Sequence, residues 1–154
     1  MGERLERVSP PNFDAIDWEQ LGKEGRGERR PWGGFITLWE KNPPDLSLAD
    51  LTERVAEKFL YFKPGMRNSY QRHKHRGERW TILQGEAKVC CGERDDAEDI
   101  TFQRLSSGDK ITIPCGILHQ IENVGKEVLI IHEEHFGYYD EKDIIRLQDD
   151  FGRT

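Results

Sequence analysis

Four residues in two separate segments of this chain carry side chains that bind divalent metals. They are Gln71, His73, Glu78 and His119. Side chains alternate between the two faces of an extended strand, so Gln71 and His73 face the same way, and a glycine turn lets Glu78 return to that place. Imidazole nitrogen, carboxylate oxygen and amide oxygen suit zinc, manganese, iron, nickel or cobalt. The pattern predicts one divalent metal ion, with His119 as a ligand from a separate strand.

The elements that must position these side chains read as strands. From residue 31 onward, short β-rich runs alternate with turn signals, a pattern typical of all-β domains. A charged tip between two of these runs, residues 94–98, is expected to be a solvated hairpin turn. Strands are expected over residues 34–39, 55–63, 68–73, 79–84, 86–91, 99–105, 110–113, 119–123 and 127–136. Many short strands around a metal site fit a double-sheet jelly roll.

The two ends of the chain differ from this β-rich middle. Residues 1–30 are charged and interrupted by prolines and glycines, a composition that predicts a mobile or loosely docked N-terminal arm. The main domain is expected over residues 31–154. Residues 140–149 place three apolar side chains in a charged setting. A short C-terminal helix over the mouth of the barrel is expected there.

Composition excludes several classes of partner. The chain has 154 residues and a formal net charge of −6, which argues against nucleic acid because neutralising phosphates needs a basic surface. No apolar run approaches the ~20 residues of a membrane-spanning helix. Three cysteines do not make an even disulfide framework. A reducing, cytoplasmic location is the simplest expectation.

The spacing of the metal-binding residues resembles the two signature motifs of the cupin superfamily. Reading from Gln71 fits every interval of the first motif, whereas reading from a literal His73-x-His75 leaves only two residues before Glu78. The first motif is then met by Gly65, Gln71, His73, Glu78 and Gly85, and the second by Gly108, Pro114, Gly116, His119 and Asn123. The resemblance implies a cupin double-stranded β-helix, or jelly-roll barrel.

A closer resemblance is to the C-terminal cupin domain of type II mannose-6-phosphate isomerases. It rests on residues 69–80, Arg-Pro-Trp-Gly at 30–33, Asp-Ile-Ile-Arg at 143–146 and Asp-Asp-Phe-Gly-Arg at 149–153. It implies a metal-dependent aldose–ketose isomerase acting on a sugar or sugar phosphate, with Arg146 holding the phosphate, in a homodimer. Two-domain members of this family also have a nucleotidyltransferase domain, whose glycine-rich nucleotide-binding loop is absent from this sequence. Guanylyltransferase activity is therefore not expected.

The catalytic base has three candidates, since His75, His132 and Glu134 could each reach the cavity. The chain departs from the family's pattern at Arg79 and over residues 131–134, so the sugar is left open. Two alternatives to the isomerase also stay open. One is a non-catalytic sugar-binding or regulatory cupin, and the other is an iron dioxygenase, which usually has histidine in place of Gln71.

Overall fold

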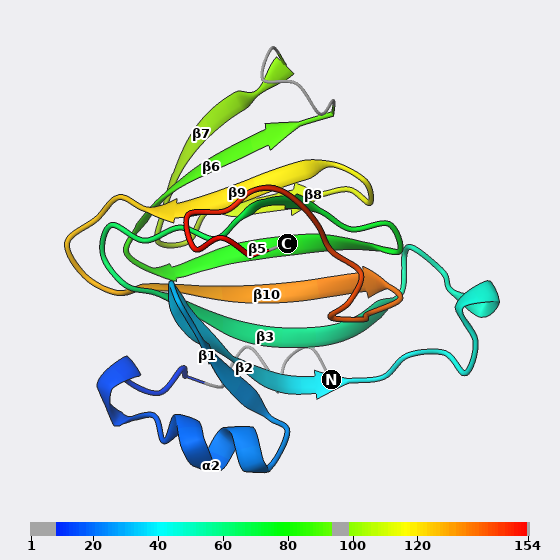
Figure 1. Ribbon diagram of the computed structural model, residues 1–154, viewed down its shortest axis with the longest axis horizontal. Coiled ribbons are helices and arrows are strands. Elements are labelled where there is room, and N and C mark those ends of the chain that lie inside the picture. The colour runs from blue at the N-terminus through cyan, green and yellow to red at the C-terminus, as the bar shows by residue number, and fades with distance from the viewer. Residues whose placement is uncertain (1–8, 94–98, 154) are drawn as a thin grey trace.

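Two antiparallel β-sheets make up most of the computed structural model, which describes residues 9–93 and 99–153 (Figure 1). The first eight residues of the expected arm and the expected hairpin tip at 94–98 lie outside these described residues. The prediction of an all-β fold is confirmed. No helix in the described ranges is long and apolar enough to cross a membrane.

The first sheet has six strands in the order β1, β2, β3, β10, β5 and β8. Their bounds are β1 Gly27–Arg30, β2 Gly33–Glu40, β3 Arg54–Phe62, β10 Leu129–Gly137, β5 Arg76–Gln84 and β8 Lys110–Ile113. Strands β3 and β10 lie at its centre and pair along nearly their whole length, from Leu129 opposite Phe62 to Phe136 opposite Arg54. Side chains from this central pair reach the interior.

The second sheet has five strands in the order β11, β4, β9, β6 and β7. Their bounds are β11 Ile145–Gln148, β4 Tyr70–Arg72, β9 Leu118–Asn123, β6 Glu86–Gly92 and β7 Thr101–Ser106. One register pair, Gln71 opposite His119, joins β4 to β9. It brings the two predicted metal-binding segments side by side.

Apolar side chains from both sheets form the main core. Burying such side chains is the dominant favourable term in folding. The members of this cluster are Trp32, Phe35, Leu60, Phe62, Trp80, Ile82, Ala87, Val89, Leu105, Ile113, Ile121, Leu129 and Ile131. The polar site described below lies beyond one end of this core, so the core fixes the strands that carry the site.

The N-terminal segment is docked over its described part. It contains a 3-10 turn η1 (Phe13–Ala15), helix α2 (Trp18–Lys23), which lies beside β1 in Figure 1, and β1 itself, which pairs with β2. Trp18 packs edge-on against Tyr61 with ring centroids 6.2 Å apart. The Tyr61 hydroxyl donates a hydrogen bond of 2.8 Å to the Pro11 carbonyl. The segment therefore covers the outer face of the first sheet.

One segment of the chain differs from the expectation, and one further turn was not predicted. Residues 140–149 do not form the predicted helix: they contain a turn followed by strand β11, which pairs with β4. A second 3-10 turn, η2 (Leu46–Leu48), lies in the loop between β2 and β3. The correction at β11 matters most, because this strand carries Arg146 beside the site.

Candidate metal centre and adjoining cavity

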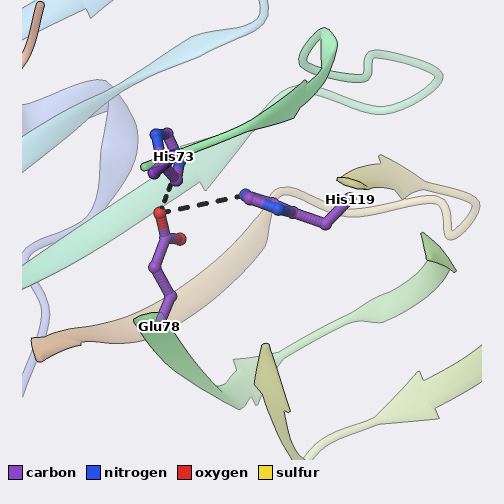
Figure 2. Close-up of side chains that lie close together, drawn as sticks. All are labelled: His73, Glu78 and His119. Carbon is purple, nitrogen blue, oxygen red and sulfur yellow. Dashed lines mark ion pairs between the residues drawn. The ribbon is translucent and has the colours of Figure 1, made fainter. Parts of the chain in front are cut away.

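His73, Glu78 and His119 converge between the two sheets (Figure 2). His73 directly follows β4, Glu78 lies in β5 and His119 lies in β9. One ligand atom from each lies within 4.8 Å of the other two, and all three residues are buried. Glu78 Oε1 lies 2.7 Å from His73 Nε2 and 3.8 Å from His119 Nε2.

Both imidazoles are oriented by backbone carbonyls behind them. His73 Nδ1 lies 2.6 Å from the Asp143 carbonyl oxygen, and His119 Nδ1 lies 2.9 Å from the Ile117 carbonyl oxygen. A carbonyl only accepts, so each Nδ1 is protonated and donates, which leaves Nε2 of each ring directed at the Glu78 carboxylate. Fixing the tautomer through the far nitrogen is how proteins prepare histidines for metals.

The electrostatics of the three groups suit a cation. Burial opposes the charge of Glu78, but the charge and hydrogen bond of His73, with a smaller contribution from His119, hold the pKa of Glu78 well below its usual value, so it is a carboxylate. Burial lowers the pKa of His119 to about 4, so it is neutral at neutral pH, as a metal ligand must be. Two ring nitrogens and one carboxylate that meet at the same place suit a positive charge between them.

An orphaned atom gives a direct test of fit. His119 Nε2 is buried and has no hydrogen-bond partner in the described part of the chain. A buried polar atom left unpaired costs about 1–3 kcal/mol, so such atoms in native proteins usually serve a ligand or a reaction. The donor set of two nitrogens and one carboxylate matches that of catalytic zinc sites. These residues therefore fit a divalent transition metal.

Gln71 lies beside the three but with its amide nitrogen toward them. Its Nε2 lies 3.4 Å from His73 Nε2, while its Oε1 accepts a hydrogen bond of 2.5 Å from the Ser69 hydroxyl. A metal would need the oxygen instead, which a rotation of the amide supplies. Gln71 is thus near the candidate metal centre, but in this geometry it does not offer a ligand atom.

A polar cavity adjoins the candidate metal centre. Arg30 and Arg146 line it from the edge strands β1 and β11, and Arg153 lines it from the segment that follows β11. Burial lowers the pKa of Arg146, and the charges of Arg153 and Arg30 add to that effect, so the three groups interact. The remaining lining residues are Trp32, Phe35, Lys58, Leu60, Asn68, Gln71, Arg76, Glu78, Glu133, His135, Tyr139, Glu141 and Ile144.

The three candidates for the catalytic base do not line this cavity. His75 is exposed in the loop between β4 and β5. On β10, His132 contacts Glu57 at 2.9 Å and Glu134 pairs with Arg54 and Arg79, all on the outer face of the sheet. Side chains alternate along a strand, so the neighbours of His132 and Glu134 are the ones that face inward.

Those inward-facing neighbours are Glu133 and His135, which the sequence analysis did not select. Burial and the charge of Glu78 raise the pKa of Glu133 well above its usual range. Lys58 faces the same cavity from β3, and burial lowers its pKa to about 8, against the charge of Glu133. The sequence did contain a signal for them: Leu129 and Ile131 face the core, so every second residue after them on the strand, Glu133 and His135, faces inward as well. It was obscured because residues 128–131 are all apolar.

Comparison with known proteins identifies the domain. A family model described as "Mannose-6-phosphate isomerase C-terminal" matches residues 24–149. The chain is 35% identical over 144 residues to the alginate biosynthesis protein AlgA of Pseudomonas aeruginosa, covering 88% of this chain and 26% of that protein. It is 33% identical to a mannose-1-phosphate guanylyltransferase of Escherichia coli, again over 88% and 26%. The chain thus spans about a quarter of the length of these relatives.

The names of these relatives overturn one expectation. They are a guanylyltransferase and proteins of alginate and xanthan biosynthesis, and none of the three kinds is named an isomerase. The predicted aldose–ketose isomerase is therefore wrong. The coarser expectation of kinship with enzymes of carbohydrate metabolism is confirmed.

Solved structures agree on the fold. The capsular polysaccharide assembling protein CapF of Staphylococcus aureus superposes with a TM-score of 0.65 at 18% identity, over 79% of this chain and 34% of that one. The Cnp3 cupin domain of Schizosaccharomyces pombe superposes with a TM-score of 0.57 at 19% identity, over 85% and 75%. At such identities the likeness concerns the fold alone. This chain is a cupin and belongs to the mannose-6-phosphate isomerase C-terminal family.

Proposed function

We propose that this cupin domain holds one divalent transition metal with His73, Glu78 and His119, and binds a phosphorylated sugar in the adjoining cavity. The observation that supports it most is the orientation of the two histidines. Both donate through Nδ1 to backbone carbonyls, which leaves both Nε2 atoms directed at the Glu78 carboxylate. Without a ligand, burying these three polar groups costs desolvation free energy that a bound cation would offset.

The polar groups of the cavity supply the rest of the ligand's chemistry. Guanidinium groups recognise phosphate through paired, charge-assisted hydrogen bonds, and Arg30 and Arg146 line the cavity. Arg153 lines it too and adds positive charge, although Asp149 accepts hydrogen bonds from its Nε and Nη2. A bound metal would supply a Lewis acid for sugar hydroxyl oxygens. The net charge of −6 does not oppose this, because the positive charge is local.

The relatives suggest which sugar. A guanylyltransferase named for mannose 1-phosphate handles a phosphorylated mannose, and we extend that class of ligand to this domain. The domain's share in the activity of a longer protein of this kind is part of the proposal. Binding, and not isomerisation, is the step assigned to it.

Two measurements test the proposal. Elemental analysis of the purified chain should find about one transition metal per chain, and His119→Ala should lose most of it while circular dichroism stays that of a β-protein. His75→Ala is the matched control, because His75 lies in the exposed loop next to the site. Unchanged metal content in His119→Ala would refute the metal centre. Calorimetry with the cobalt-loaded chain should detect binding of mannose 1-phosphate, and absence of binding would refute the ligand.

A further inference from the structure

A second polar cluster lies in the cavity beside the candidate metal centre. It consists of Glu133 and His135 on β10, Lys58 on β3 and Tyr139, all of them buried. In register, His135 lies opposite Glu78 and Glu133 lies opposite Trp80, so the cluster continues along the same wall as the metal ligand. Four polar side chains on an inner wall cost desolvation unless something in the cavity compensates them.

His135 is the least satisfied member of this cluster. Its side chain is 1% exposed, yet neither ring nitrogen has a hydrogen-bond partner among the residues described. His135 Nε2 approaches Glu133 Oε1 to 2.7 Å, but the contact is not aligned as a hydrogen bond. Its ring stacks on Tyr139 with centroids 4.9 Å apart and 29° between the planes, which fixes the ring while Nδ1 has no hydrogen-bond partner among the residues described.

The other three members hold the wall in place. Trp80 Nε1 donates a hydrogen bond of 2.7 Å to Glu133 Oε2, which orients that carboxyl group. The Lys58 ammonium lies 4.1 Å from the Phe35 ring centroid and 4.2 Å from that of Tyr139, and it donates to the Tyr139 hydroxyl. Lys58 is therefore engaged with its neighbours, whereas His135 Nδ1 is open to a ligand and Glu133 Oε1 lies beside the same ring.

We propose that His135 and Glu133 form a hydroxyl-binding subsite that recognises the sugar ring of the phosphorylated ligand. The inference rests on the proposed function and adds the orientation of the ligand. A hydroxyl group both donates and accepts, so it can satisfy an imidazole nitrogen and a carboxyl oxygen at once. The arginines come from edge strands and the tail, and His135 comes from the central strand β10. The phosphate then binds at the edge and the ring against β10.

The experiment compares ligands that share a phosphate but differ in their hydroxyl groups. Mannose 1-phosphate, glucose 1-phosphate and inorganic phosphate are titrated calorimetrically into the cobalt-loaded full chain and into His135→Phe. Phenylalanine keeps the ring that stacks on Tyr139 and removes both nitrogens. His132→Phe is the matched control, because His132 lies on the same strand but faces outward. Glu133→Gln is a second variant, and cobalt content and thermal midpoint are measured for all.

Because a hydrogen-bond partner is lost, the affinity of His135→Phe for mannose 1-phosphate should be about tenfold to a hundredfold lower than that of the wild type. The difference between its affinities for mannose 1-phosphate and glucose 1-phosphate should also become smaller. Inorganic phosphate should change less than about twofold. If His135→Phe does not fold, Glu133→Gln takes its place in the test, with the same expected changes in affinity. An equal loss of affinity for all three ligands, or no loss for any of them, would refute the proposed subsite. A wild-type chain that binds phosphate no more weakly than sugar phosphates overturns the subsite alone, whereas one that binds none of the three also overturns the proposed function.

Discussion

Arg146 shows how one residue at this site depends on a distant part of the chain. In β11 it lies opposite Gln71 of β4, and its guanidinium lines the cavity with those of Arg30 and Arg153. The resemblance to a sugar-phosphate enzyme family suggested a phosphate-binding role for it. The strand pairing gives that role a geometric basis, because it sets Arg146 next to the segment that carries the candidate metal centre.

Replacing Arg146 by lysine should weaken phosphorylated ligands selectively. Lysine keeps the charge but loses the planar fork, and a charged hydrogen bond contributes roughly 1.5–3 kcal/mol. Calorimetry should therefore show mannose 1-phosphate binding reduced on the order of tenfold to a hundredfold, with cobalt content unchanged. The affinity for unphosphorylated mannose should stay almost unchanged. Equal loss on both sugars, or on neither, would make Arg146 structural.

At the residue scale, the sequence predicted the candidate metal centre better than the cavity wall. Fixed intervals around His73, Glu78 and His119 are readable because turns hold them in register. Glu133 and His135 were not selected because both faces of β10 are covered over residues 128–131, by the core inside and the N-terminal segment outside. Alternation between polar and apolar residues disappears where neither face meets water.

At the scale of elements, two bidentate ion pairs order the C-terminal segment, one within the segment and one that ties it to Arg67. Arg153 donates from Nε and Nη2 to Asp149 at 2.9 Å each, and Arg67 donates to Asp150 at 2.7 and 2.8 Å. The hydrogen bonds from Arg153 lower the pKa of Asp149 to about 2. Its stabilising contribution is therefore complete above the ordinary aspartate pKa, near 4, and is lost as the pH falls through about 2.

Asp149→Asn should loosen this segment without unfolding the barrel. The amide keeps one acceptor but loses the charge, so local stability should fall by about 1 kcal/mol. Amide hydrogen exchange at neutral pH should become faster over residues 145–153 and stay unchanged in β3 and β10. In the wild type, the same segment should open first on acidification between about pH 4 and 2. Exchange that rises equally in all strands would contradict a local anchor.

The C-terminal segment also marks a limit of sequence reasoning about elements. Nine strands between residues 33 and 137 were predicted close to their observed bounds, since each has its own β-rich run and turn signals. Strand β11 was expected as a helix because Ile144, Ile145 and Leu147 fit either period over so short a stretch. Its pairing partner β4 lies some seventy residues earlier in the chain, and a local pattern cannot register that contact.

At the scale of the whole molecule, we predict a homodimer. Strand β7 is an edge of the five-stranded sheet, and Phe102 on it is 62% exposed. An edge strand with an exposed aromatic side chain is a template for pairing with another chain. Light scattering at micromolar concentration should give twice the chain mass of 18.0 kDa, and Phe102→Lys should shift the mass toward that of one chain. A wild-type chain that scatters as a monomer would refute the prediction.

The hydrogen bond from His73 Nδ1 to the Asp143 carbonyl has a consequence for biosynthesis. Ribosomes add about 5–20 residues per second, so Asp143 is made about one to five seconds after His119. Until then His73 lacks the carbonyl that selects its tautomer, although the three side chains of the candidate metal centre already exist. Maturation of the candidate metal centre is thereby coupled to completion of the barrel, and a nascent chain is poorly prepared to capture an ion before its strands are in place.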